Sequence, residues 1–504
     1  KKADFKQIGA RFRIDPVTAR IIRNRGIEGE AAIDRYLNGT LDDLYDPMLL
    51  KDMERAVSIL CEAVDTGKKI RIVGDYDIDG VCSTYILLQA FERLGSDVDF
   101  EIPDRIKDGY GINESIIEQA HADGVEVILT CDNGISAFHQ VELAKKYGMT
   151  VVITDHHEVP LDGEKEKIPP ADAVIDPKQA DCPYPFPEIC GAVVAYKLVQ
   201  VLYARRGVPQ MEWLDLLEFA AIATVGDVMK LQDENRILVK YGLKKMAQTK
   251  NLGLRRLAEK NNLDLGAITA YHIGFVIGPC LNAGGRLKTA KEALALLRAQ
   301  SEEEAERLAE ELKELNDTRK DMTEQGTEAA KLQVESWYQK DKVLVVFLPE
   351  CHESLAGIIA GRLREYYQKP AIVLTRGEEA VKGSGRSIDE YHMFKKLTEV
   401  SDLLLKFGGH PLAAGLSLEE KNIDEFRRRL NENAGLTEED FKAKVWIDVP
   451  MPVGYVTERL VRELSSFTAF APCVFAFLMT CASSIISYSN VRPRYAARSR
   501  FNRS

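Results

Sequence analysis

Acidic and histidine side chains recur in four short motifs in the first half of the chain. The motifs are Gly-Asp-Tyr-Asp-Ile-Asp-Gly at 74–80, Thr-Cys-Asp-Asn-Gly at 130–134, Thr-Asp-His-His at 154–157 and Val-Gly-Asp at 225–227. In an extended segment, residues two apart face the same side, so Asp75, Asp77 and Asp79 could converge unless the chain turns first. Like charges at short range repel one another, and a divalent cation is the usual reason for them to persist. The motifs therefore indicate a metal site.

Single motifs also have plainer interpretations. An aspartate at the end of a strand often caps the helix that follows it. The run from Asp75 begins like the calcium loop of an EF-hand, but that loop lies between helices and needs Glu at its twelfth position, which here is Ile86. Neither interpretation explains why the four motifs occur together.

Aspartate oxygens with one or two imidazoles suit manganese or magnesium, whereas zinc would favour more His or Cys ligands. Two such ions, about 3.5–4 Å apart, could hold the attacking and leaving oxygens of an in-line phosphoryl displacement and lower the pKa of a bridging water. We therefore expect two Mn²⁺ or Mg²⁺ ions, with manganese favoured, and hydrolysis of a phosphodiester without a protein nucleophile.

The segments around the motifs predict one parallel sheet. Apolar segments alternate with amphipathic helices from residue 69 onward, which is typical of an α/β fold. Strands are predicted at 69–73, 98–102, 125–130 and 150–154, and helices at 81–94, 137–147, 192–205 and 213–224. Ligands of open parallel sheets bind beyond the carboxyl ends of the strands. The first three motifs should therefore gather along one edge, while the fourth closes the last of these helices.

A long helix is predicted to separate this sheet from a second α/β segment. Residues 301–338 are dense in Glu and Lys and place Leu308, Leu312 and Leu315 at helical spacing. A helix of about 35 residues would span roughly 50 Å. The second segment opens with a predicted strand at 342–348 and continues to about 435.

The composition is that of an ordinary globular protein. At 504 residues the chain is too long for a single core. A net charge of -11 does not favour a protein that coats nucleic acid over a broad basic face, so any basic groove must be local. The nine cysteines form no C-x-x-C pair, and no apolar run reaches the roughly 18 residues that would span a bilayer. We expect reduced thiols and a cytoplasmic location.

The motifs resemble those of the DHH phosphoesterase superfamily, with Asp155-His156-His157 as the motif that names it. The resemblance implies a specific set of metal ligands: Asp77, Asp79, Asp132, His156 and Asp227. It implies supporting or catalytic roles for Asp75, Asp155 and His157.

Within that superfamily, the chain resembles the RecJ family from Gly74 to Gly415. The resemblance is carried by Pro-Asp-Arg at 103–105, Gly-Tyr-Gly at 109–111, Gly-Pro at 278–279 with Leu-Asn-Ala at 281–283, Gly-Arg-Leu at 285–287, Gly-Ser-Gly-Arg-Ser at 383–387 and Gly-Gly-His at 408–410. It implies an α/β fold in which a parallel-sheet DHH catalytic domain is joined by a long helix to a smaller α/β domain of DHHA1 type. The expected parts are a helical lead-in at 1–50, the DHH domain at 51–300, the helix at 301–340, the DHHA1-type domain at 341–435 and a truncated or altered OB-type region at 436–504.

The string at 383–387 could bind a terminal phosphate. It offers backbone N–H groups, hydroxyls and a guanidinium, although alone it could equally be a surface turn. If the string faces the metal site, the expected substrate contacts are Arg105, Arg286, Ser384, Arg386, Ser387, Gly409 and His410. His410 follows two glycines that permit close backbone approach, so it could touch the scissile phosphate and is also a candidate catalytic residue.

The resemblance implies a single-strand-specific exonuclease of DNA repair and recombination that works from the 5′ end and releases 5′-mononucleotides. A RecQ-type helicase and a single-strand-binding protein are the implied partners. Two alternatives stay open. One is a DHH enzyme of short oligoribonucleotides or cyclic dinucleotides, and the other is an inactive DHH-like scaffold of a replication assembly, which would be expected to lack metal ligands.

The sequence departs from the family pattern at two places. Cys280 stands where many family members carry Arg, so one phosphate contact is absent or is supplied elsewhere. After Val445 the sequence lacks the interleaved aromatic and basic residues of a single-strand platform. The second departure bears on DNA affinity rather than on hydrolysis.

Overall fold

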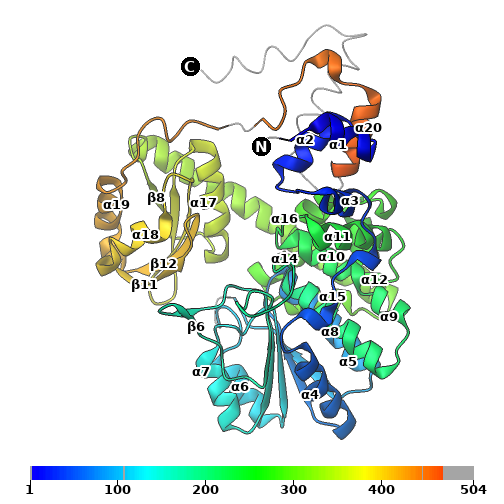
Figure 1. Ribbon diagram of the computed structural model, residues 1–504. Coiled ribbons are helices and arrows are strands. Elements are labelled where there is room, and N and C mark those ends of the chain that lie inside the picture. The colour runs from blue at the N-terminus through cyan, green and yellow to red at the C-terminus, as the bar shows by residue number, and fades with distance from the viewer. Residues whose placement is uncertain (1–2, 106–107, 445–446, 469–504) are drawn as a thin grey trace.

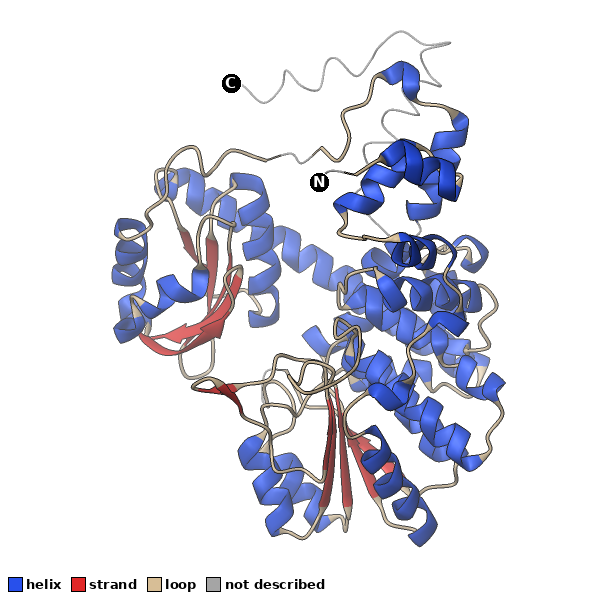
Figure 2. Ribbon diagram, in the orientation of Figure 1, coloured by secondary structure: helices blue, strands red, loops and turns tan. Residues whose placement is uncertain are grey.

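The computed structural model describes residues 3–105, 108–444 and 447–468. The chain forms a larger lobe and a smaller α/β lobe, and the long helix α16 (Glu302–Gln333) runs from one to the other (Figure 1). Each lobe contains one five-stranded sheet. Loops at one end of the larger lobe's sheet lie on the side of the smaller lobe (Figure 2).

The sheet of the larger lobe is parallel throughout and has the order β2-β1-β3-β4-β7. Its strands are β1 (Ile70–Val73), β2 (Val98–Glu101), β3 (Val127–Cys131), β4 (Thr150–Thr154) and β7 (Ala173–Ile175). Strands β1 and β3 are buried along their whole length and are mainly apolar, as a parallel sheet between two helical layers requires; the exception in β1, Arg71, pairs with Asp99 and Asp123. Because the strands run in one direction, the loops that follow them share one edge.

Helices cover both faces of this sheet. One face shares a core with α4 (Met53–Thr66), α5 (Ile78–Arg93) and α8 (Gly191–Arg206). The other face shares a core with α6 (Glu114–Ala122) and α7 (Phe138–Lys146). A short hairpin, β5 (Leu161–Asp162) and β6 (Lys165–Glu166), extends from the loops after β4.

A helical bundle completes the larger lobe. Its helices are α9 (Gln210–Leu214), α10 (Leu217–Gly226), α11 (Asp233–Met246), α12 (Leu252–Lys260), α13 (Ala270–His272), α14 (Gly278–Leu287) and α15 (Lys291–Leu297). A π-helical segment, Ile273–Ile277, joins α13 to α14. Helix α10 packs against α5 and α8, so its C-terminal end reaches the loops at the sheet edge.

The smaller lobe contains a mixed sheet of order β11-β12-β10-β9-β8. Its strands are β8 (Leu344–Phe347), β9 (Ala371–Arg376), β10 (Val381–Arg386), β11 (Leu404–Gly409) and β12 (Ala413–Leu418). The pair β8–β9 is parallel, and the remaining pairs are antiparallel. The helices of this lobe are α17 (Glu353–Tyr367), α18 (Met393–Thr398) and α19 (Ile423–Glu432).

The C-terminal part of the described chain returns to the N-terminal helices. These are α1 (Phe5–Phe12), α2 (Pro16–Asn24) and α3 (Glu30–Asn38), and α20 (Glu458–Thr468) lies beside the first two (Figure 1). Leu460 and Leu464 of α20 are buried against Ile21 of α2. The Asp15 backbone N–H donates a 2.8 Å hydrogen bond to the Glu463 carboxylate.

The predicted fold class is confirmed, and most predicted elements have the right type. The four predicted strands correspond to β1 to β4 with ends within two residues. The predicted helix at 213–224 is divided between α9 and α10, and the long helix at 301–338 is α16 followed by a π-helical turn, Val334–Tyr338.

Residues 447–468 contain α20 and a 3₁₀ turn and no strand. Residues 469–504 lie outside the described residues, so the altered OB-type region stays a prediction. Among the described residues, no helix combines the length and the apolar character needed to cross a membrane.

Candidate metal centre

Side chains from the four motifs meet at the carboxyl edge of the parallel sheet. Their ligand atoms form three overlapping groups, in each of which all ligand atoms lie within 4.8 Å of one another. The groups are Asp79 with His156 and Asp227, Asp75 with Asp77 and Asp132, and Asp132 with His156 and His157. Because Asp132 and His156 each belong to two groups, the cluster is one continuous site whose ligands can divide between two ions.

The first motif turns directly into α5 and does not stay extended. The side-chain Oδ1 of Asp77 caps this helix by accepting hydrogen bonds from the backbone N–H of Asp79 at 2.9 Å and of Gly80 at 3.2 Å. Asp79 lies in the first helical turn, and its two carboxylate oxygens accept 2.7 Å hydrogen bonds from the backbone N–H groups of Gly191 and Ala192 at the start of α8. The chain therefore turns before Asp75, Asp77 and Asp79 can line up on one side of an extended segment. Two helix N-termini hold these carboxylates instead.

Gly191 sets the distance between α8 and the second motif. A Cβ atom at this position would lie 2.8 Å from Asp132 Cβ and 2.9 Å from Asp132 Cα, which is closer than side chains pack. The absence of a side chain thus allows the start of α8 to hold Asp79 while it touches Asp132.

Asp132 and His156 are buried at the centre of the cluster. His156 Nε2 lies 3.1 Å from Asp132 Oδ1, 3.4 Å from Asp79 Oδ2 and 3.9 Å from Asp227 Oδ2. Asp132 adopts the left-handed region with φ 61°, a strained conformation for a residue other than glycine. Such strain is typical of functional positions, where it orients a side chain.

Asp155 holds His157. Its Oδ1 lies 2.7 Å from His157 Nδ1, and its Oδ2 accepts a 2.9 Å hydrogen bond from the Ile135 backbone N–H. The Tyr110 hydroxyl donates to the Asp132 carbonyl at 2.8 Å and lies 3.1 Å from His157 Nδ1. Both oxygens of Asp155 are therefore engaged within the protein, which favours a positioning role for this residue.

Burial and mutual repulsion disfavour several negative charges in this cluster. Burial, together with Asp77, raises the pKa of Asp75 to about 7. Burial and Asp79 raise the pKa of Asp227 to about 8, and the same two causes raise the pKa of Asp132 well above its usual range. A divalent cation would remove this repulsion, so the electrostatics favour cation binding.

The two histidines differ. Burial lowers the pKa of His156, which favours the neutral imidazole that ligates metals. Burial also opposes protonation of His157, but its hydrogen bond to Asp155 and the negative charges of Asp155, Asp79 and Asp227 together outweigh burial and raise the pKa of His157 to about 9. His157 is therefore held as a cation beside the carboxylates when no metal is present.

The residues fit the two ions that the sequence indicates. Asp132 Oδ1 is a buried carboxylate oxygen that accepts no hydrogen bond among the described residues, as expected for an atom reserved for a cation. The donors are carboxylate oxygens and imidazole nitrogens, a set suited to manganese or magnesium. Asp77, Asp79, Asp132, His156 and Asp227 would hold the ions, and Asp75 and His157 lie close enough to contribute.

A cavity of about 710 Å³ lies between the smaller lobe and the side of the larger lobe that carries the metal-site motifs. We call the segments that contain these motifs (74–80, 130–134, 154–157 and 225–227) the metal loops. Its lining includes Arg105, Gly109 and Arg286 from the larger lobe and Gly357, Ser384 and Arg386 from the smaller lobe. The Arg105 guanidinium lies 3.9 Å from the ring centre of Tyr76, which stands between two of the clustered aspartates. Arg286 Nη1 donates to the Ser354 carbonyl at 3.0 Å and so joins the lobes. The cavity thus places guanidinium groups beside the metal site.

Gly357 of α17 makes room for the predicted phosphate-binding residues. A Cβ atom there would lie 2.8 Å from Arg386 Nη2 and 2.9 Å from Ser384 Oγ. Arg386 Nη1 donates to Ser384 Oγ at 3.2 Å, so the two side chains form one polar unit on β10. The string at 383–387 is a strand rather than the surface turn that was its alternative.

Three other predicted residues lie outside the lining of this cavity. Ser387 is fully buried, and its hydroxyl donates to the Tyr391 carbonyl at 2.6 Å, so it supports the end of β10. Gly409 ends β11 with φ 148°, and His410 is exposed in the turn to β12. Cys280 is buried in α14, where its Sγ accepts a 3.3 Å hydrogen bond from Asn316 Nδ2.

Sequence reasoning gave no role to several residues that shape the centre. Asn133 Nδ2 donates to the Val73 carbonyl at 3.0 Å and to the Cys131 carbonyl at 2.9 Å, which ties β1 to β3. Asn133 stood within a quoted motif and could have been found there. Asp176 is fully buried after β7, and burial raises its pKa to about 7, but no recognisable motif surrounds it.

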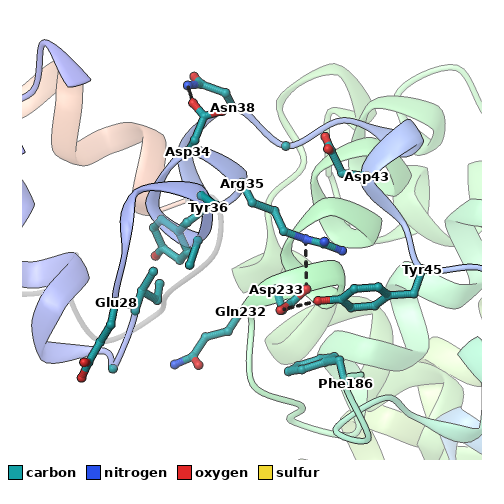
Figure 3. Close-up of a pocket in the computed structure, with 15 residues that line it drawn as sticks. Glu28, Asp34, Arg35, Tyr36, Asn38, Asp43, Tyr45, Phe186, Gln232 and Asp233 are labelled. Atoms are coloured by element: carbon teal, nitrogen blue, oxygen red, sulfur yellow. Dashed lines mark hydrogen bonds and ion pairs between the residues drawn. The ribbon is translucent and has the colours of Figure 1, made fainter. Parts of the chain in front are cut away.

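A separate cavity of about 900 Å³ lies between α3 and the helices of the larger lobe (Figure 3). Arg35 Nε lies 3.1 Å from Asp233 Oδ1, and the Tyr45 hydroxyl donates to Asp233 Oδ2 at 3.1 Å. These polar groups pair mainly with one another, so that Arg35 of α3 and Tyr45 both contact Asp233 of α11. The lining contains none of the predicted metal or phosphate residues, so this cavity is distinct from the candidate metal centre.

Comparison with known proteins agrees with this architecture. The model of the DHH family, N-terminal domain, matches residues 69–224, and the DHHA1 domain matches residues 340–435. The single-stranded-DNA-specific exonuclease RecJ of Bacillus subtilis is 37% identical over 469 residues, which cover 92% of this chain and 58% of that protein. RecJ of Escherichia coli is 36% identical over 440 residues, which cover 83% of this chain and 74% of that protein.

Solved structures agree as well. The crystal structure of RecJ from Thermus thermophilus in complex with Mn²⁺ matches with a TM-score of 0.78 at 30% identity, over 92% of this chain and 65% of that one. A second structure, exonuclease RecJ bound to manganese, matches with a TM-score of 0.67 at 33% identity, over 78% of this chain and 96% of that one. This chain thus spans about three fifths of the B. subtilis relative's length and matches its relatives across both lobes. The chain belongs to the RecJ family of DHH phosphoesterases.

Proposed function

We propose that this chain is a two-metal exonuclease that degrades single-stranded DNA from the 5′ end and releases 5′-mononucleotides. The observation that carries the proposal is the cavity of guanidinium and hydroxyl groups, between the lobes, that adjoins the acidic cluster. A 5′-terminal phosphate bound by Ser384 and Arg386 would leave the first phosphodiester nearest the metal ligands. Cleavage there releases one nucleotide.

Unpaired arginines supply the positive charge of this region. Burial, together with Arg105 and Arg319, lowers the pKa of Arg286 to about 10, and burial and Arg362 lower the pKa of Arg319. Among the described residues, none of these four arginines, nor Arg386, forms an ion pair with a carboxylate. Clustered cations without counter-ions favour an anionic ligand, and a phosphate matches the planar guanidinium donors.

Each side chain has a defined task in this proposal. When bound, the two ions would supply an activated water and neutralise charge on the phosphodiester. Asp155 keeps His157 oriented, so that His157 can donate a hydrogen bond to a phosphate oxygen. Arg286, fixed by its hydrogen bond to Ser354, can bind the phosphate chain between the two lobes. His410 remains a proposed contact to the scissile phosphate.

The first experiment follows manganese-dependent hydrolysis of a single-stranded oligonucleotide labelled at either end, with and without a 5′ phosphate. We expect immediate release of 5′-labelled mononucleotide and none from Asp132→Ala. Turnover of dinucleotides without any attack on the long strand would favour the short-substrate alternative. Rapid digestion of duplex DNA, or full activity of Asp132→Ala, would contradict the proposal.

The phosphate pocket has its own test. Arg386→Ala should raise KM for a 5′-phosphorylated strand about 10- to 100-fold, since charge-assisted hydrogen bonds contribute about 1.5–3 kcal/mol, and should change KM for a 5′-hydroxyl strand much less. Arg376→Ala is the matched control, because Arg376 ends the neighbouring strand β9 but is half-exposed and contacts Glu350 and Glu420. An equal loss for both strand types would argue against a terminal-phosphate site.

The partners and location are also part of the proposal. A RecQ-type helicase and a single-strand-binding protein are supported only by the family resemblance, and the cytoplasmic location by composition. Co-purification of the full chain with either partner, compared with the surface variant Arg376→Ala as a control, would test the first point.

A further inference from the structure

Two aromatic rings stand exposed beside the metal loops, on the helical run that begins at α13. Tyr271 exposes 53% and Phe275 57% of its surface. The rings stack on each other with centroids 4.8 Å apart and planes at 27°. Large aromatic side chains normally bury their faces. This pair instead presents apolar ring surface to solvent.

Glycines allow the same helical run to pack directly against the metal loops. A Cβ at Gly274 would lie 3.7 Å from Val225, two residues before Asp227, and a Cβ at Gly278 would lie 3.2 Å from Ile78, between Asp77 and Asp79. A Cβ at Gly285 would lie 2.4 Å from the Tyr76 carbonyl oxygen. The run therefore follows the metal loops closely along its length, and its position is fixed relative to the scissile bond.

The backbone of this run explains why the rings point outward. Ile273 and Ile277 are fully buried, and Tyr271 and Phe275 alternate with them at the same four-residue spacing. Residues Ile273–Ile277 form a π-helix, a rare geometry that is frequent at functional sites. The buried pair anchors the segment to the larger lobe, and the exposed pair stays free to contact a ligand.

The run also links the rings to the phosphate-binding region. Arg286 lies eleven residues after Phe275, about 16 Å along a helix at 1.5 Å per residue. Arg319 and Lys320 of α16 lie near Cys280 in the middle of the run. An extended strand that follows α14 would have cations beside its phosphates and the two rings beside its bases.

We infer that Tyr271 and Phe275 form a stacking platform for unpaired nucleobases of the strand that is being degraded, a few nucleotides to the 3′ side of the scissile phosphate. This inference rests on the proposed nuclease function. Stacking on aromatic rings is independent of base identity, because every base offers a π-face. Paired bases stack within the duplex and cannot offer their faces, so the platform would also select single strands.

Binding without turnover tests the platform. Metal-free protein in EDTA is titrated with 5′-phosphorylated oligonucleotides that carry 2-aminopurine at successive positions from the 5′ end. We expect the wild-type protein to quench the probe at one or two positions. Tyr271→Ala and Phe275→Ala should each abolish this quenching and weaken binding about 10-fold, or up to 100-fold for both together, as expected for stacking lost from one or two bases.

An abasic sugar at the quenched position gives the sharper measurement. It should weaken binding to wild-type protein but not weaken binding further to the double variant, because the same contact is already lost. Tyr271→Phe should retain wild-type behaviour. Trp337→Ala is the matched control, since Trp337 is 70% exposed on the π-helical turn after α16, outside the helical run that carries Tyr271 and Phe275.

The outcomes separate this inference from the proposed function. Because the platform is placed a few nucleotides to the 3′ side of the scissile phosphate, the double variant should hydrolyse a 5′-phosphorylated dinucleotide at the wild-type rate. If the wild-type protein degrades long strands but the abasic penalty is unchanged in the double variant, the platform is wrong and the nuclease stands. If the wild-type protein hydrolyses neither substrate, the proposed function fails, and the inference fails with it.

Discussion

Gly191→Ala is the change whose consequence can be worked out most directly from the structure. The new Cβ would lie 2.8 Å from Asp132 Cβ, whereas ordinary contacts begin near 3.4 Å, so α8 or the Asp132 loop must move by at least about 0.6 Å, the difference 3.4 − 2.8. Gly191 does not have a positive φ, so the backbone itself accepts alanine. Any effect therefore arises from the contact.

The displacement acts on both sides of the metal site. It pulls the Gly191 and Ala192 N–H groups away from Asp79, which now accepts 2.7 Å hydrogen bonds from both, and it moves Asp132. Because misplacement of catalytic groups by about 1 Å can cost 100-fold in rate, we expect kcat to fall about 10- to 100-fold. The overpacking should also cost about 1–3 kcal/mol of stability.

The assay combines calorimetric titration of manganese with steady-state hydrolysis of a 5′-phosphorylated single strand at saturating metal. Gly361→Ala is the matched control, because Gly361 is also helical, in α17, and its added Cβ would meet no atom within 4 Å. The control should keep its rate. A folded Gly191→Ala protein with wild-type manganese affinity and kcat would show that the start of α8 does not position these ligands.

Three further predictions concern metal, charge and pH. Manganese at about 100 times its Kd should stabilise the fold by about 2.7 kcal/mol, seen as a rise of the thermal midpoint that EDTA reverses. Asp132→Asn should be more stable than wild-type protein without metal, since a repelled buried carboxylate is removed, but should lose most of the manganese-induced rise; equal rises in both proteins would refute the ligand assignment. Burial raises the pKa of Glu218 from 4.5 to about 7. Between these two pH values the folded protein keeps a proton on Glu218 that the unfolded chain has lost. The free energy of unfolding should therefore fall as the pH rises from 4.5 to 7. Glu218→Gln should flatten that fall and be more stable at pH 8 by about 3 kcal/mol; parallel midpoint curves for the two proteins would show that Glu218 is not the group responsible.

The sequence was sufficient for the sheet edge because its information is local. A short apolar run followed by Asp at 75, 132 or 155 specifies a strand and the side chain at its end, and parallel pairing then brings the ends together. The structure of the smaller lobe was less accessible. Strands β10 and β12 are rich in Gly, Ser and Ala, and such residues carry little alternation of apolar and polar side chains.

The remaining features depend on contacts between distant segments. Gly191 approaches Asp132 across about sixty residues of sequence, and no pattern around either position specifies that approach. Ser387 was predicted to contact a phosphate because it belongs to the motif at 383–387. In the structure its buried hydroxyl donates to the Tyr391 carbonyl instead. The exposure of Tyr271 and Phe275 could not be predicted either, because two large aromatic residues at helical spacing are more typical of a buried helix face.

The contact between α20 and α2 has a consequence for how the chain folds. Ile21 is covered by Leu460 and Leu464, so the apolar face of α2 is completed only by residues made about 440 positions later during synthesis. Closing a loop of that length is entropically unfavourable, and contacts of such high sequence separation form slowly. Helix α2 therefore keeps an uncovered apolar face until α20 has been made, and exposed apolar surface on a partly folded chain favours aggregation.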